Sequence, residues 1–339
     1  MDTFVKFRIV IVTFTIASFF QSCTEKKEEI RFNNPLVLQR ADPWVHKTDD
    51  GIYYFIATSP EFDRIEIRKS ETINGISDAE AHVVWSKHAS GPMSHHIWAP
   101  ELHRFNDTWY IYFAAGRSED VWRIRMWVLS NDSEDPTQGE WVEEGQIHTQ
   151  RDAFALDATT FEHRGQRYLI WTENGLNDFR GTGLLIAEMK DHATIDEREV
   201  IITKPEYDWE IQGHWVNEGP AVLKRNNRIF VTFSASATDH NYAIGLLWAD
   251  KDSDLLDPAS WNKLPEPVFY TNPEFNRFGP GHNSFTVAED GKTDIMIYHA
   301  RDYMELQGSP LSDPNRHTRA RVITWTEDGF PDFGQDIDD

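Results

Sequence analysis

The feature of this sequence that most restricts its fold is a pattern that recurs five times between residues 41 and 298. In each copy a polar residue opens a short strand-like segment, a turn follows, and a β-branched or aromatic segment returns. The opening residues are Asp42, Glu101, Asp157, Glu218 and His282, at steps of 59, 56, 61 and 64 residues. Four antiparallel strands with their loops need about 40 to 60 residues, the size of one propeller blade.

The segments around these residues support an all-β reading. Turns such as Asp49-Asp50-Gly51 and Asp290-Gly291 are hairpin signals. Further strands are expected at residues 64–68, 83–85, 123–129, 184–188, 200–203, 243–248 and 320–325. The sequence therefore predicts one five-bladed β-propeller over residues 33–339, with residues 36–39 as a candidate strand to complete the fifth blade. A β-sandwich is the alternative, but it gives no reason for the recurring polar residue.

The first 32 residues have a different character. Lys6 and Arg8 precede an apolar run at residues 9–20, which is shorter than the roughly 20 residues that a spanning helix needs. Cys23, the only cysteine, follows this run, so no internal disulfide is possible. The arrangement resembles a bacterial lipoprotein signal. We expect residues 1–22 to be removed, Cys23 to be lipidated, and residues 23–32 to act as a tether; an ordinary secretion leader is the alternative.

The net charge of the chain limits the kinds of partner that it can bind. Its formal net charge is −23, and a polyanion of this kind is a poor partner for DNA or RNA. We expect a monomer that touches a membrane of the bacterial cell envelope through its lipid anchor only.

A propeller would bring the five opening residues to one mouth of its central channel. Four carboxylates and a histidine would then share one site, and mutual repulsion would raise some carboxyl pKa values. Such a site suits glycosidic bond cleavage, which needs one protonated and one ionised carboxyl group. Calcium sites also gather carboxylates, so convergence alone does not decide between the two.

Several short motifs identify a family. Arg40-Ala41-Asp42-Pro43, residues 97–101, Leu156-Asp157-Ala158, residues 217–220 and residues 279–283 resemble glycoside hydrolase family 43 in order and spacing. The resemblance covers about residues 33 to 335. It implies that Asp42 is the general base, that Glu218 is the general acid, and that Asp157 orients Glu218 and raises its pKa.

Other residues are expected to bind the sugar. Trp98 stands beside the Ala99-Pro100 turn, where an aromatic ring would form a wall of the pocket. The resemblance places Arg316, and less directly Arg301 and Glu101, on the substrate. It places His282 near the axis, contacting either the carboxylates or a water-coordinated Ca²⁺. The structural alternatives are a blade-core tryptophan, ion pairs in the channel wall and a core histidine.

The sequence thus predicts an exo-acting, inverting hydrolase that releases terminal α-L-arabinofuranose from arabinan, arabinoxylan or their oligosaccharides, with no cofactor required for the chemistry. The rival within the family is a β-D-xylosidase. The rival outside it is a non-catalytic carbohydrate-binding propeller, although a binding module has no need of a base, an acid and a modulator together.

Overall fold

The computed structural model describes residues 1–3, 30–177 and 179–338 of the chain. Residues 31–339 form one compact unit. Residues 4–22 of the predicted signal sequence, and Cys23, lie outside the described residues, and their roles stay predictions. Within the described residues, no helix is both long enough and apolar enough to cross a membrane.

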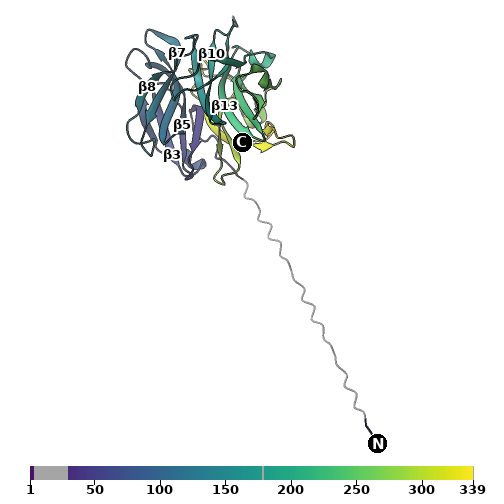
Figure 1. Cartoon of the computed structure of the whole chain (residues 1–339). Coiled ribbons are helices and arrows are strands. Elements are labelled where there is room, and N and C mark those ends of the chain that lie inside the picture. Colours follow the sequence, from purple (N-terminus) through teal and green to yellow (C-terminus); the bar gives the residue numbers. More distant parts are fainter. Residues whose placement is uncertain (4–29, 178, 339) are drawn as a thin grey trace. The chain divides into compact units, whose positions relative to one another are not determined.

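Five antiparallel sheets follow one another along the chain, as the coloured ribbon in Figure 1 shows. Blade 1 contains β1 (Ala41–Lys47), β2 (Tyr53–Thr58), β3 (Arg64–Ser70) and β4 (Ala81–Ser86). Blade 2 contains β5 (His95–Phe105), β6 (Thr108–Arg117), β7 (Asp120–Asn131) and β8 (Val142–Gln146). Blade 3 contains β9 (Ala155–His163), β10 (Gln166–Asn174), β11 (Thr182–Glu188) and β12 (Val200–Thr203).

The last two blades continue this order. Blade 4 contains β13 (Asn217–Arg225), β14 (Arg228–Ala235), β15 (Ala243–Asp250) and β16 (Asn262–Lys263), and blade 5 contains β17 (Phe278–Val287), β18 (Asp294–Arg301) and β19 (His317–Val322). A separate pair, β20 (Thr324–Trp325) and β21 (Pro331–Asp332), follows. Helical structure in the described part of the chain is limited to 3₁₀ turns: η1 (Asn74–Ile76), η2 (Asp208–Glu210), η3 (Pro258–Ser260) and η4 (Pro273–Phe275).

The innermost strands form a ring, because β1 packs beside β5, β5 beside β9, β9 beside β13, β13 beside β17, and β17 beside β1. Apolar clusters fill the space between consecutive blades. Trp109 and Trp171 are fully buried in two of these clusters. Burying a large apolar side chain stabilises the fold by about 1.5–3 kcal/mol. The prediction of a five-bladed, all-β propeller is confirmed.

The N-terminal segment completes the fifth blade. Val37 forms an antiparallel bridge with Thr318 of β19, and the side chain of Asn34 bonds both backbone groups of Ala320 at 2.8 and 2.9 Å. The candidate closing strand at residues 36–39 is therefore confirmed at Val37. The ring is closed by joining the two ends of the propeller through one sheet.

One strand expectation was wrong. Residues 320–325 do not form a single strand, because β19 ends at Val322. Its partner β18 begins at Asp294, whose carbonyl accepts the N–H of Ile323. No residue of β18 remains to pair beyond that point, so Thr324 and Trp325 pair with Pro331 and Asp332 instead.

Candidate active site

Each innermost strand carries a β-bulge near its first residues. The register of the strand pair shifts once in blades 1, 3 and 4 and twice in blades 2 and 5, and one residue at a shift in each blade has a left-handed backbone. These residues are Asp42 (φ 53°), Ala99 (φ 44°), Asp157 (φ 55°), Gly219 (φ 56°) and His282 (φ 42°). A bulge bends its strand and redirects a side chain, and a left-handed non-glycine residue stores strain that often accompanies a functional site.

Several of these bulges open on one pocket of about 420 Å³. The pocket contains six of the eight predicted site residues: Asp42, Trp98, Asp157, Glu218, His282 and Arg316. Its remaining lining residues are Trp122, Phe154, Leu156, His214, Thr238, Ser309, Pro310 and Leu311. The site therefore combines three carboxyl groups with one guanidinium group and an apolar wall.

Asp42 lies beside a hydroxyl donor, a guanidinium group and two histidines. Thr58 Oγ1 donates to Asp42 Oδ2 at 2.7 Å, and Arg316 Nη1 donates to Asp42 Oδ1 at 3.3 Å. His282 Nδ1 and His299 Nδ1 lie 3.3 and 3.5 Å from the same Oδ1. Burial alone would raise the pKa of this carboxyl, but Arg316, the two histidines and Thr58 together hold it well below its usual range. Asp42 is thus an ionised carboxylate.

Glu218 has the opposite character. Burial raises its pKa to about 7, with a further contribution from the Asp42 charge, although the Tyr242 hydroxyl and Arg316 act to lower it. The Tyr242 hydroxyl donates to Glu218 Oε1 at 2.7 Å, which fixes the carboxyl group in one orientation. Glu218 can therefore hold a proton near neutral pH and release it to a bound molecule.

Asp157 is the third buried carboxyl of the pocket. Its Oδ2 accepts the N–H of Gly219 at 3.0 Å, so it holds the backbone beside Glu218. Burial and repulsion from Glu218 and Asp42 raise the pKa of Asp157 well above its usual range. Glycine is favoured at position 219, because its φ is +56° and a Cβ there would stand 3.0 Å from the His282 ring.

Sequence similarity now decides the family. The chain matches the family described as glycosyl hydrolases family 43 over residues 32–331. It belongs to this family.

Individual relatives agree with that assignment. The extracellular exo-α-(1→5)-L-arabinofuranosidase of Streptomyces chartreusis is 53% identical over 279 residues, which are 82% of this chain and 85% of that protein. α-L-Arabinofuranosidase 43 of Humicola insolens is 47% identical over 98% of this chain and 69% of its own length. The crystal structure of an α-L-arabinofuranosidase from Lactobacillus brevis superimposes with a TM-score of 0.87 at 49% identity, covering 91% of this chain and 97% of that one. The protein is a family 43 glycosidase.

Cross-blade hydrogen bonds hold the family 43 pocket together. The N–H groups of Asp42, Ala99 and His282 donate to side chains on the second strand of the preceding blade, namely His299 Nδ1, Thr58 Oγ1 and Ser234 Oγ, at 3.0, 2.7 and 2.7 Å. The strained bulges are thus fixed from the neighbouring blade. Sequence reasoning missed Thr58, His299 and Tyr242. A polar residue near the end of each returning strand was the available signal for the first two.

Glu101 and Arg301 are the two predicted residues that do not line the pocket. Glu101, two residues beyond the bulge residue Ala99, is buried outside this pocket, and its Oε2 lies 2.9 Å from His103 Nε2. Arg301 is buried behind the pocket and donates to the carbonyls of Thr238 and Pro310 at 2.8 and 3.1 Å. The structure thus gives both residues supporting contacts.

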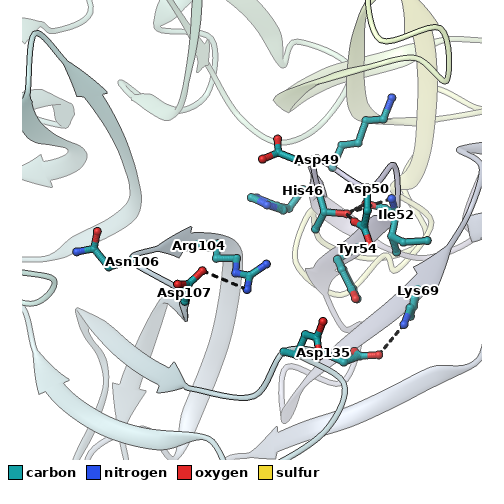
Figure 2. Close-up of a pocket in the computed structure, with 13 residues that line it drawn as sticks. His46, Asp49, Asp50, Ile52, Tyr54, Lys69, Arg104, Asn106, Asp107 and Asp135 are labelled. Atoms are coloured by element: carbon teal, nitrogen blue, oxygen red, sulfur yellow. Dashed lines mark hydrogen bonds and ion pairs between the residues drawn. The ribbon is translucent and has the colours of Figure 1, made fainter.

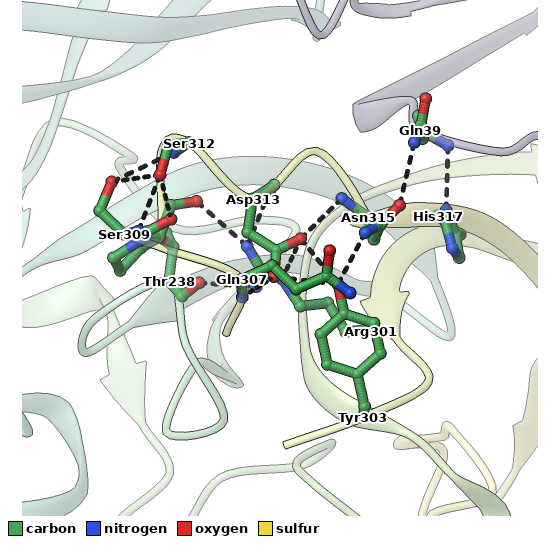
Figure 3. A network of polar contacts seen from close by, with 11 residues as sticks. Gln39, Thr238, Arg301, Tyr303, Gln307, Ser309, Ser312, Asp313, Asn315 and His317 are labelled. Carbon is green, nitrogen blue, oxygen red and sulfur yellow. Dashed lines mark hydrogen bonds and ion pairs between the residues drawn. The ribbon is translucent and has the colours of Figure 1, made fainter. Parts of the chain in front are cut away.

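The contacts of Arg301 belong to a network that shapes one wall of the pocket (Figure 3). Asp313, 1% exposed, accepts hydrogen bonds from the Tyr303 hydroxyl and from the N–H groups of Gln307 and Asn315 at 2.8 to 3.0 Å. Arg301 Nε lies 3.7 Å from Asp313 Oδ1. We call residues 302–316 the blade 5 loop. This loop supplies residues 309–311 and Arg316 to the pocket.

A second cavity, of about 790 Å³, lies between blades 1 and 2 at the other ends of their inner strands (Figure 2). It is lined mainly by charged side chains, including the Lys69–Asp135 pair at 2.7 Å and the Arg104–Asp107 pair at 3.6 Å. It shares no lining residue with the family 43 pocket.

The family resemblance left a water-coordinated Ca²⁺ near His282 as one alternative, so the residues near His282 must be considered as ligands. Within the described residues, no group of three or more His, Cys, Asp or Glu side chains is arranged to ligate a metal directly. Asn283, Ser284 and His299 have buried polar atoms that lack hydrogen-bond partners among the described residues. Such neutral groups fit water molecules, or the hydration shell of a cation, better than direct coordination.

Proposed function

We propose that this protein is an exo-acting α-L-arabinofuranosidase that removes terminal arabinofuranose from arabinan, arabinoxylan or their oligosaccharides with inversion of configuration. Asp42 activates the attacking water, Glu218 protonates the departing oxygen, and Asp157 holds Glu218 in place. The relatives named arabinofuranosidase, at 53% and 47% identity, support the choice of sugar.

The observation that carries the proposed mechanism is the unequal environment of two carboxyls in one pocket. Arg316, His282 and His299 keep Asp42 ionised, whereas burial keeps Glu218 protonated up to a pH of about 7. An inverting glycosidase needs this pair: one carboxylate to take a proton from water and one acid to give a proton to the leaving group.

The exo mode follows from the blade 5 loop. Residues 309–311 stand at one side of the pocket and are held from behind by Arg301 and Asp313. A fixed wall on one side admits the end of a sugar chain and blocks its continuation. Arg316, in the same wall, donates to Asp42 and is placed to meet the hydroxyls of a terminal ring.

The proposal is tested on α-1,5-linked arabinotriose, with proton NMR of the first product. We expect arabinose to be released one unit at a time, first as the β-anomer. First release of the α-anomer would contradict the role of Asp42 as base, because it would require a covalent intermediate. Mixed oligomers from arabinan in the first minutes would contradict the exo mode, and faster cleavage of xylosides would identify a β-xylosidase.

We also propose that the enzyme is secreted and anchored by a lipid at Cys23, and that it works as a monomer. Two relatives named extracellular support secretion. A hydrated Ca²⁺ in the channel, held through water by His282 and Asn283, would add positive charge below the carboxylates. Removal of Ca²⁺ by a chelator should then lower the melting temperature, and added Ca²⁺ should restore it.

A further inference from the structure

A row of aromatic rings leads from the pocket to the surface. The Trp98 ring lies 4.4 Å from the His96 ring, and the His96 ring is stacked on the Trp122 ring at 4.8 Å with an interplanar angle of 29°. Phe62 packs edge-on against Trp98 at 5.8 Å. We call Trp98, His96 and Trp122 the aromatic row.

The two tryptophans of this row differ in exposure. Trp98 is 9% exposed, whereas Trp122 is 54% exposed although it also lines the pocket. His96 covers one face of Trp122, so much of the remaining indole surface is open to solvent. The indole Nε1 of Trp98 is buried and has no acceptor among the described residues. The open aromatic face of Trp122 is suited to a sugar ring, which presents C–H groups.

The backbone that carries the row is strained. Met93, His96 and Ala99 all have left-handed φ values, of 54°, 54° and 44°, and the pairing of β5 with β6 shifts in register between His95 and Trp98. Strain of this kind persists only where surrounding contacts enforce it, and it is concentrated at functional sites. Burial, with the nearby charges of His95 and Lys87, lowers the pKa of His96, so its ring stacks as a neutral imidazole.

The position of the row in the ring of blades indicates what it binds. The wall of residues 309–311 belongs to blade 5, and in a ring of five the border between blades 2 and 3 lies opposite blade 5. Trp122 begins the third strand of blade 2, and Phe154 precedes blade 3; both line the pocket. A chain whose terminal ring meets the blade 5 wall therefore leaves the pocket over Trp122.

We propose that Trp122, supported by His96, is the platform for the sugar unit on the leaving-group side of the scissile bond. This inference rests on the proposed exo-glycosidase function and adds a specificity determinant: the enzyme recognises a pentose ring beyond the one it releases.

The test compares two substrates, α-1,5-arabinotriose and methyl α-L-arabinofuranoside, whose leaving group is too small to stack. Trp122→Ala should lower the ratio of their kcat/KM values about tenfold, mainly through KM for arabinotriose. Trp122→Phe should recover most of that ratio. Trp215→Ala is the matched control, because Trp215 is also exposed, at 44%, but lies outside the pocket lining.

Equal losses on both substrates, no loss on either, or an equal change of the ratio in Trp215→Ala would each overturn the platform. Wild-type protein that cleaves neither arabinofuranoside would instead contradict the proposed function. In that case the same variants are compared on xylotriose and methyl β-D-xylopyranoside, where the tenfold ratio change is again expected. Melting temperatures show that the variants are folded.

Discussion

Asp42 and Glu218 show how residue type alone fails to define a catalytic role. Both are carboxyl groups buried in one pocket, yet one is held as an anion and the other as an acid. The difference comes from their surroundings: Arg316 and His299 of blade 5 lie beside Asp42, whereas burial raises the pKa of Glu218. Chemistry at this scale is set by the contacts that the ring assembles.

The pH dependence of the reaction should follow from these two environments. Glu218 must be protonated to act, so kcat/KM should fall as pH rises through about 7. Asp42 must be ionised, and its low pKa keeps it so in acid, which places the acid limb below the usual aspartate value of 3.8. Kinetics from pH 3 to 9 measure the alkaline limb and show whether activity persists below pH 3.8. An unchanged alkaline limb in Glu218→Gln would show that another group sets it.

The same groups should affect stability in opposite directions. The raised pKa of Glu218 means that the fold disfavours its charge, so its contribution to stability is lost as pH rises from about 4.5 to 7. Glu218→Gln removes this penalty and should raise the melting temperature at pH 8 but not at pH 4.

Asp42→Asn should act in the other direction. It leaves the Arg316 charge buried without its counter-ion and should destabilise the protein by about 3–5 kcal/mol at neutral pH. Calorimetry of both variants at the two pH values checks the pair. A fall in melting temperature at pH 8 for Glu218→Gln would contradict the assigned charge states.

At the scale of elements, the sequence predicted where the strands lie but not the register shifts within the strand pairs. The alternation and turns predicted the strands, because side-chain period and turn chemistry are local properties. The bulge is a backbone property: what recurs at its first position is a left-handed φ, shared by Asp42, Ala99 and Gly219. Counting polar residues therefore selected Glu101, two residues beyond Ala99. The sequence analysis missed Tyr242 because its hydrogen-bond partner, Glu218, lies on a strand elsewhere in the sequence.

The blade 5 loop supplies a prediction at this scale. Asp313→Ala removes the acceptor of three donors and the partner of Arg301, so residues 309–311 should lose their fixed position. KM for arabinotriose should rise about tenfold with a smaller change in kcat, because the wall positions the sugar while the carboxyls stay in place. Steady-state kinetics measure the split.

Asp302→Asn is the control for this loop. Asp302 is an exposed carboxylate at the start of the same loop and pairs with Arg319, so its replacement should leave KM within about twofold. A kcat loss in Asp313→Ala as large as its KM increase would show that the loop acts on the chemistry itself.

At the scale of the whole molecule, the ring depends on a short segment that lies about 280 residues before its partner strand β19. Asn34 and Val37 join β19 and thereby link the first and last blades. Asn34→Ala loses two hydrogen bonds and should cost about 1–3 kcal/mol of unfolding free energy. Asn33→Ala, next to it and exposed, should be neutral. Denaturant unfolding compares them, and equal stabilities would show that the closure does not limit unfolding.

The anchor gives a second prediction at this scale. If Cys23 is lipidated, the wild-type enzyme should partition with membranes, and Cys23→Ser should move it to the soluble fraction or block its maturation. Fractionation with an activity assay checks this. Equal partitioning of both forms would mean that Cys23 is not the anchor.

The repeated bulge has a consequence for how this scaffold can change. Every blade has a left-handed residue at a bulge, and Asp42, Ala99, Asp157, Gly219 and His282 hold one such position in each blade. Existing contacts restrict substitution at four of these positions. Asp42, Asp157 and His282 make polar contacts, and the His282 ring packs against Gly219. Ala99 carries only a methyl group. New reactivity in this scaffold, whether by natural divergence or by engineering, would therefore enter most readily through the second blade.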